Sequence, residues 1–110
     1  SIYSLTKQHQ EEISKMIGEI YEIDVITCRY FNCYGSRLSL SNPYTGVTSN
    51  FINNIVNNIS PMVYEDGGQL RDYIHVSKAA EIIVKTLNTQ ENRTYNISTG
   101  KPISLRRLIR

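Results

Sequence analysis

A long helical pattern runs directly into a short strand-like pattern near the start of this chain. Four apolar residues repeat at helical spacing within residues 3–21, namely Ile13, Met16, Ile17 and Ile20. Residues 24–30 are then rich in β-branched and apolar types, as in a parallel strand that is buried on both faces. A helix that is followed at once by such a strand predicts an α/β fold.

The rest of the pattern consists of shorter elements. We expect helices over residues 51–59 and 79–87, strands at 62–64, 73–76 and 94–97, and a loop over 35–46. Thr48 or Ser49 is the candidate N-cap of the second helix, and Ser104 that of a last helix. Because a parallel strand needs neighbours and the chain offers few good ones, we expect this chain to be a piece of a larger protein.

The composition limits the classes of function. The chain has 110 residues, of which 40% are hydrophobic and 20% charged, as in one modest globular domain. Its net charge of +2 does not indicate a nucleic-acid partner, and we expect Arg106, Arg107 and Arg110 to form a solvated helix face. No apolar run approaches the roughly 20 residues of a membrane span, so we expect no membrane partner and a cytoplasmic location. Cys28 and Cys33 lack the spacing of metal ligands, so we expect free, at least half-buried thiols and no metal.

A tyrosine and a lysine four residues apart open the first helix. One helical turn places the Tyr3 and Lys7 side chains on the same face, where the ammonium can lower the pKa of the phenol. Such a phenol is suited to proton transfer. The alternative is an ordinary solvated surface pair, which the spacing alone does not exclude.

Four motifs follow one another in a fixed order. They are Tyr3-x-x-x-Lys7; Arg29-Tyr30-Phe31-Asn32-x-Tyr34-Gly35; Asn42-Pro43-Tyr44-Thr45-Gly46-Val47; and Glu65-Asp66-Gly67-x-x-x-Arg71-Asp72-Tyr73-Ile74-His75-Val76. Together they resemble the extended short-chain dehydrogenase/reductase superfamily, the NAD-dependent epimerases and dehydratases of nucleotide sugars. The resemblance implies the C-terminal part of a Rossmann-like parallel sheet in residues 1–34, and part of a small substrate-binding domain in residues 35–110.

The resemblance also implies a cofactor site for NAD. Tyr3 matches the family's catalytic acid/base beside the nicotinamide, and Lys7 matches the lysine that holds the nicotinamide ribose. Tyr30 and Phe31 match the strand end whose backbone touches nicotinamide, although both rings could instead belong mostly to the core. The family's catalytic Ser/Thr and its glycine-rich pyrophosphate turn precede the tyrosine in relatives, and this chain contains neither.

Four further residues match substrate-binding positions. Asn32 corresponds to an asparagine that hydrogen-bonds the sugar diphosphate, and Arg71 to an arginine that pairs with the phosphates. Val47 and Tyr64 correspond to positions that line the nucleotide pocket. Three alternatives stay open: Asn32 in a left-handed turn, Tyr64 in the core, and Arg71 paired only with Asp72 or Asp66.

The function implied is that of a nucleotide-sugar 4-epimerase, which acts on a UDP-sugar through a 4-keto intermediate. The alternatives are a 4,6-dehydratase or decarboxylase of the same family, or a non-catalytic binding or assembly fragment. We expect the 110 residues alone to be inactive, and we expect self-association, such as a homodimer, with the helix at residues 3–21 as a candidate interface. The sequence departs from the family at Ser36, where relatives usually have proline, and at Ser77 and Lys78, where they usually have an aspartate.

Overall fold

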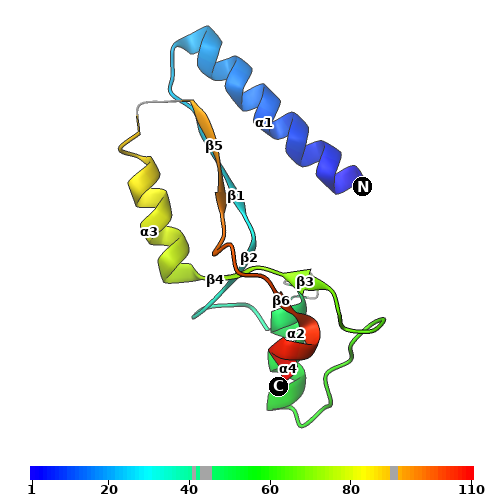
Figure 1. Ribbon diagram of the computed structural model, residues 1–110. Coiled ribbons are helices and arrows are strands. Elements are labelled where there is room, and N and C mark those ends of the chain that lie inside the picture. Colours follow the sequence, from blue (N-terminus) through cyan, green and yellow to red (C-terminus); the bar gives the residue numbers. More distant parts are fainter. Residues whose placement is uncertain (41, 43–45, 90–91) are drawn as a thin grey trace.

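The computed structural model describes residues 1–40, 42, 46–89 and 92–110. Pro43, Tyr44 and Thr45 of the third motif, with part of the predicted 35–46 loop, therefore lie outside the described residues. The elements, shown in Figure 1, follow in the order α1 (Ile2–Tyr21), β1 (Ile26–Tyr30), β2 (Asn32–Tyr34), α2 (Val47–Val56), β3 (Leu70–Arg71), β4 (Tyr73–His75), α3 (Val76–Thr86), β5 (Arg93–Ile97), β6 (Ile103–Ser104) and α4 (Leu105–Ile109). The predicted α/β class is confirmed.

Helix α1 forms where the apolar spacing predicts it. The Ser1 hydroxyl accepts the backbone N–H of Ser4 at 3.2 Å and caps the first turn. Glu22 ends the helix in the left-handed region at φ 53°, and the Ile23 N–H donates to the Gly18 carbonyl at 2.9 Å. The apolar face is exposed, since Ile13 and Met16 keep 55% and 60% of their surface open to solvent. Only Gly18 is buried.

Among the described residues the strands form three separate two-stranded ladders and not one continuous sheet. Strands β1 and β5 pair in parallel with Cys28 opposite Tyr95, and β2 and β4 pair in parallel with Cys33 opposite Ile74. Strands β3 and β6 pair antiparallel, with Arg71 opposite Ile103. In Figure 1, helices α1 and α3 lie on opposite sides of the β1–β5 pair, as in a layered α/β fold.

At Phe31 the chain changes its pairing partner, from β5 to β4. The Phe31 N–H donates to the Ile97 carbonyl at the end of β5, and the next N–H, that of Asn32, donates to the Asp72 carbonyl; both bonds are 3.1 Å long. One extended segment, 26–34, thus pairs first with β5 and then with β4. This change of partner brings Asn32 to the end of the β1–β5 pair and beside the fourth motif.

A small core lies under α3. Ile74 of β4 and Ile97 of β5 are fully buried, and Ala79 of α3 packs against them with Cys28, Ile82 and Tyr95 at the edge. Each buried isoleucine contributes roughly 1.5–3 kcal/mol relative to an exposed one. The predicted helix and the two predicted strands all form, and the structure packs them together in this core.

Several predicted boundaries are wrong. Helix α2 begins at Val47 and ends at Val56, and Gly46 is its N-cap without a side-chain hydrogen bond, so neither Thr48 nor Ser49 caps it. Helix α3 begins at Val76, because the His75 ring nitrogen accepts the Ser77 N–H and caps the helix three residues earlier than expected. The predicted strand at 62–64 is absent from the described structure; the Tyr64 carbonyl instead accepts the Gln69 side-chain amide at 3.2 Å. No described helix has both the length and the apolar character that a membrane crossing requires.

Candidate functional site

Helix α1 places Tyr3 and Lys7 on one face, as their spacing predicts. The Lys7 ammonium lies 5.8 Å from the centroid of the Tyr3 ring, a cation–π arrangement. The same ammonium donates to the Gln10 side-chain oxygen at 3.1 Å. Both residues are exposed, with 71% of Tyr3 open to solvent. A reactant could therefore reach the phenol directly.

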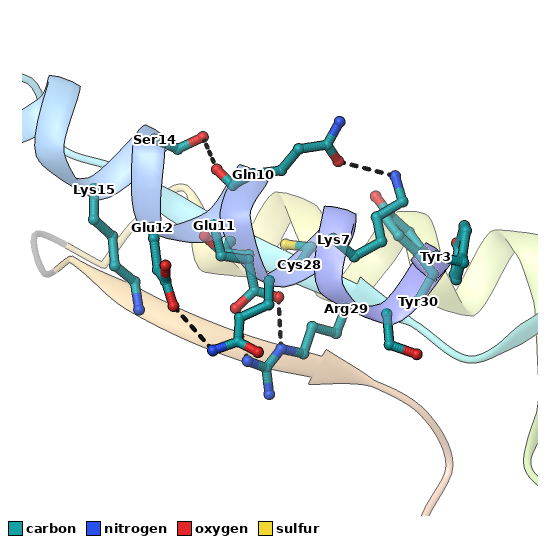
Figure 2. Close-up of a pocket in the computed structure, with 13 residues that line it drawn as sticks. Tyr3, Lys7, Gln10, Glu11, Glu12, Ser14, Lys15, Cys28, Arg29 and Tyr30 are labelled. Carbon is teal, nitrogen blue, oxygen red and sulfur yellow. Dashed lines mark hydrogen bonds and ion pairs between the residues drawn. The ribbon is translucent and has the colours of Figure 1, made fainter. Parts of the chain in front are cut away.

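A groove of about 690 Å³ runs between α1 and β1. Tyr3 and Lys7 line it from the helix, and Cys28, Arg29 and Tyr30 line it from the strand. Figure 2 shows Tyr3, Lys7 and Tyr30 near one end of this groove. The structure thus brings the predicted acid/base pair and the aromatic residue of the strand end to one cavity.

An ion pair that the sequence analysis did not single out spans the groove. The Arg29 guanidinium donates from Nε and Nη2 to the two Glu11 carboxylate oxygens at 2.7 and 2.6 Å (Figure 2). The hydrogen bond from Arg29 lowers the pKa of Glu11, and the bond to Glu11 raises the pKa of Arg29. The available signal was the position of Glu11, four residues after Lys7 and thus on the same helix face. This two-bond ion pair joins α1 to β1.

Asn32 occupies β2 and not a left-handed turn. Its side-chain Nδ2 donates to the Asp72 carbonyl at 3.1 Å, and its backbone N–H donates to the same oxygen. The Asp72 carbonyl therefore holds the half-buried Asn32 through both its backbone and its side chain. The alternative that Asn32 serves a left-handed turn is wrong, because only Glu22, Arg37, Asn58 and Glu65 are described as non-glycine residues with positive φ.

Arg71 is exposed and does not pair with either neighbouring aspartate. Its Nη1 donates to the Leu70 carbonyl at 3.0 Å. The Asp72 carboxylate accepts from Thr99 and Lys101, and the Asp66 carboxylate lies 4.0 Å from the Arg106 guanidinium. The structural alternative for Arg71 is therefore wrong in the described part of the chain, and its guanidinium faces solvent.

The other predicted site residues are placed as follows. Tyr30 and Phe31 are 55% and 45% exposed, so the alternative that their rings lie mostly in the core is wrong. Tyr64 is 76% exposed on an extended loop, so it is not a core tyrosine either. Val47 is half-buried at the first position of α2, next to Gly46, whose φ is 88°. Neither Val47 nor Tyr64 lines the groove beside Tyr3.

The prediction for the two cysteines is confirmed in part. Cys28 and Cys33 are free thiols as expected, but Cys33 is exposed where at least half-burial was predicted. His75 is exposed and caps α3, with its ring 5.3 Å from that of Tyr34, edge to face. Within the described ranges, no group of three or more His, Cys, Asp or Glu side chains is placed to hold a metal ion.

The order of motifs and the fold agree with one family of known proteins. A profile of the NAD dependent epimerase/dehydratase family matches residues 1–98. The chain belongs to this family. A protein of Methanocaldococcus jannaschii assigned as a UDP-glucose 4-epimerase is 37% identical over 108 residues, which are 98% of this chain and 35% of that relative.

Solved structures of 4-epimerases have a similar fold over the length of this chain. The chain matches a UDP-N-acetylglucosamine 4-epimerase from Methanobrevibacter ruminantium, solved with UDP-N-acetylmuramic acid, at 35% identity and a TM-score of 0.90 over 99% of this chain and 35% of that one. It matches the UDP-glucose 4-epimerase of Thermus thermophilus, solved with NAD, at 26% identity and a TM-score of 0.83 over 99% of this chain and 36% of that one. The chain thus spans about a third of the length of these family members.

Proposed function

We propose that this chain is the acid/base and substrate-binding portion of an NAD-dependent nucleotide-sugar 4-epimerase. The observation that carries the proposal is the placement of Tyr3 and Lys7 on one exposed helix face, beside Tyr30 in the α1–β1 groove. The similarity to family members with this activity supports the choice of reaction. We further propose that residues 1–34 belong to the cofactor domain and residues 35–110 to the substrate domain.

The residues at the groove fit a nicotinamide cofactor chemically. A phenol, an ammonium and an aromatic ring line one cavity, and such groups suit proton exchange, a ribose hydroxyl and a flat heterocycle. Tyr3 and Lys7, with the backbone at Tyr30 and Phe31, would hold the nicotinamide end of NAD. When bound, NAD supplies acceptance and return of a hydride at C4 of the sugar.

The chain's own residues handle the proton and the substrate. In this proposal Tyr3 takes the proton of the C4 hydroxyl and returns it, and the Lys7 ammonium lies 5.8 Å from the centre of its ring. Arg71 offers an exposed planar fork for the phosphates of the nucleotide. Asn32 contacts the sugar diphosphate, while Val47 and Tyr64 line the nucleotide site. A UDP-sugar is the proposed substrate class, as with the relatives.

Turnover by the complete protein tests the proposed function. We expect UDP-hexoses to be converted into their C4 epimers with no net consumption of NAD, and chromatographic separation of the products measures this conversion. Release of carbon dioxide would instead indicate the decarboxylase, and a 4-keto-6-deoxy sugar the dehydratase. No product from any UDP-sugar or dTDP-sugar, in a folded protein, would overturn the enzymatic proposal and leave the binding or assembly fragment.

A matched pair of variants tests the role of Tyr3. Tyr3→Phe keeps the ring but removes the transferable proton, so we expect kcat to fall by about 10²–10⁴-fold. Tyr21→Phe, an equally conservative change of an exposed tyrosine in the last turn of the same helix, should leave kcat unchanged. Equal activity of the two variants would remove Tyr3 from the mechanism.

Self-association through α1 is part of the same proposal. Its exposed apolar residues, among them Ile13, Met16 and Ile20, form an apolar surface whose exposure to solvent is energetically unfavourable. We propose that the complete enzyme is a homodimer that covers some of this face. Sedimentation of the parent and of an Ile13→Glu variant would test it: a parent that sediments as a monomer at all concentrations contradicts the proposal.

A further inference from the structure

The Asp72 carboxylate is the most fully hydrogen-bonded acid described in this chain. Asp72 is buried at 7% exposure. Its Oδ1 accepts the Thr99 backbone N–H at 2.9 Å and the Thr99 hydroxyl at 2.8 Å, and its Oδ2 accepts the Lys101 backbone N–H at 3.1 Å. The carboxylate therefore fixes the turn at residues 99–101, which leads into β6.

These bonds keep the acid ionised in spite of its burial. Burial raises the pKa of Asp72, but the backbone and hydroxyl bonds from Thr99, with the backbone bonds from Gly100 and Lys101, outweigh it and lower the pKa below the ordinary value. Among the described residues no cationic side chain pairs with this buried anion, and the donors that hold it come from the 99–101 turn. Such a group is costly to replace and keeps its neighbours in one geometry.

The backbone of Asp72 reaches in the opposite direction. Its carbonyl oxygen accepts both the backbone N–H and the side-chain Nδ2 of Asn32, each at 3.1 Å. Asp72 is also the residue at which the chain leaves the β3–β6 ladder and enters the β2–β4 ladder. One residue of the fourth motif thus joins the second motif's strand to the 99–101 turn.

Arg71 is tied to the same junction. It precedes Asp72 in the chain, and its register partner in β6 is Ile103, two residues beyond the turn that the Asp72 carboxylate holds. The position of Arg71 therefore depends on the 99–101 turn, through the pairing of β3 with β6. The position of Asn32 depends on its hydrogen bonds to the Asp72 carbonyl. Asn32 and Asp72 are 40 positions apart in the sequence.

We propose that Asp72 is a positioning residue that sets the spacing between Asn32 and Arg71, and hence between the sugar end and the phosphate end of the bound nucleotide sugar. This inference rests on the proposed function, because it needs Asn32 and Arg71 to contact substrate. The Asp72 carboxylate is buried and already accepts from Thr99 and Lys101, so in this proposal it does not contact the substrate itself. It acts by fixing the 99–101 turn with its side chain and the Asn32 amide with its carbonyl.

The test compares Asp72→Asn, Arg71→Ala and the double variant in the complete enzyme, with UDP as the titrant in calorimetry and a UDP-sugar in turnover. The new amide would direct a donor at the Lys101 N–H, so the turn would shift. We expect Asp72→Asn to weaken UDP binding and raise KM by about tenfold, from the loss of a charged hydrogen bond. In the Arg71→Ala background the same change should cost less than about threefold, because the residue that it positions is gone. Equal fold-changes in both backgrounds would overturn the positioning role.

Milder variants keep the test decisive if Asp72→Asn fails to fold. Thr99→Val removes one donor to the carboxylate, whereas Thr99→Ser keeps the hydroxyl. We expect Thr99→Val to raise KM and to lose this effect with Arg71→Ala, and Thr99→Ser to match the parent. Thr86→Ala, which removes a buried hydroxyl of α3, is the stability control and should lower the melting temperature with KM unchanged.

The outcomes separate the two proposals. A parent enzyme that neither binds UDP nor converts UDP-sugars would overturn the proposed function, and the positioning role with it. A parent that is active, together with Asp72→Asn or Thr99→Val variants whose UDP affinity and KM equal the parent values, would overturn the positioning role alone.

Discussion

Replacing Gly18 with alanine tests how closely α1 approaches the segment that leads into β1. A Cβ atom at Gly18 would lie 2.6 Å from a methyl carbon of Val25 and 2.7 Å from the backbone oxygen of Ile23. The Ile23 backbone is itself fixed, because its N–H donates to the Gly18 carbonyl at 2.9 Å. The Val25 side chain could rotate away, but the Ile23 oxygen could not move without breaking the helix end.

Two opposing effects set the magnitude. In a helix interior, alanine is favoured over glycine by roughly 0.5–1 kcal/mol. The two contacts that the added Cβ would make are well inside the optimal separation of about 3.5–4.0 Å, and overpacking of this kind costs roughly 1–3 kcal/mol. The steric cost outweighs the gain in propensity, so we expect Gly18→Ala to lower the free energy of unfolding by about 1–2 kcal/mol.

Urea denaturation measures this difference. With a slope of about 1–3 kcal/mol per molar urea, the midpoint should fall by roughly 0.3–2 M. Ser14→Ala is the matched control, since Ser14 is exposed on the same helix and alanine there should be neutral or stabilising by up to about 0.5 kcal/mol. If Gly18→Ala stabilises the protein as much as Ser14→Ala does, the close approach of α1 is refuted.

Three further predictions concern charge. Arg71→Ala in the complete enzyme should raise KM for the nucleotide sugar by about ten- to hundredfold with a smaller effect on kcat, and Arg71→Lys should recover part of it; an unchanged KM in steady-state kinetics would exclude a phosphate contact. Lys7→Met should weaken the binding of NAD to the complete enzyme, because the ammonium proposed to hold the nicotinamide ribose is lost, and an unchanged NAD affinity in calorimetry would limit Lys7 to a structural role. The pKa of Asp72 is lower in the folded state than in the unfolded state, so its stabilisation is present above about pH 4 and is lost as the pH falls through the folded-state pKa. Urea midpoints measured against pH should therefore fall more steeply in acid for the parent than for Asp72→Asn, and parallel curves would contradict this assignment.

The elements that the sequence predicted well are those with a clear repeat of apolar residues or a clear run of strand-forming residues. Helix α1 follows from four isoleucine and methionine positions, and β1 follows from a run rich in β-branched and apolar residues. The Tyr3–Lys7 face follows from the four-residue spacing alone. These features depend on local geometry, which neighbours along the chain determine.

The failed strand prediction and the contacts of Arg106 both depend on hydrogen bonds that the residue pattern does not show. The run at 62–64 has the residues of a strand, but the Gln69 side chain takes the Tyr64 carbonyl and the described structure pairs no strand with it. Arg106 is exposed on its helix as predicted, but the structure adds contacts with the 66–67 turn: its backbone N–H donates to the Gly67 carbonyl at 3.0 Å, and its Nε donates to the Asp66 carbonyl. The residue pattern along the chain does not predict these hydrogen-bond partners.

The sequence by itself determined the α/β class, the first helix and the shared face of Tyr3 and Lys7, because hydrophobic period and residue spacing act within one or two turns. Only the tertiary structure decided that Glu11 binds Arg29 and that Asp72 serves Thr99, Lys101 and Asn32 in place of Arg71. A buried aspartate accepts the donors that the fold brings to its carboxylate and its carbonyl, and the donors to Asp72 come from segments that are 27 to 40 residues away in the chain. These donors reach Asp72 because the three ladders are arranged next to one another, and the spacing of residues along the chain does not determine that arrangement.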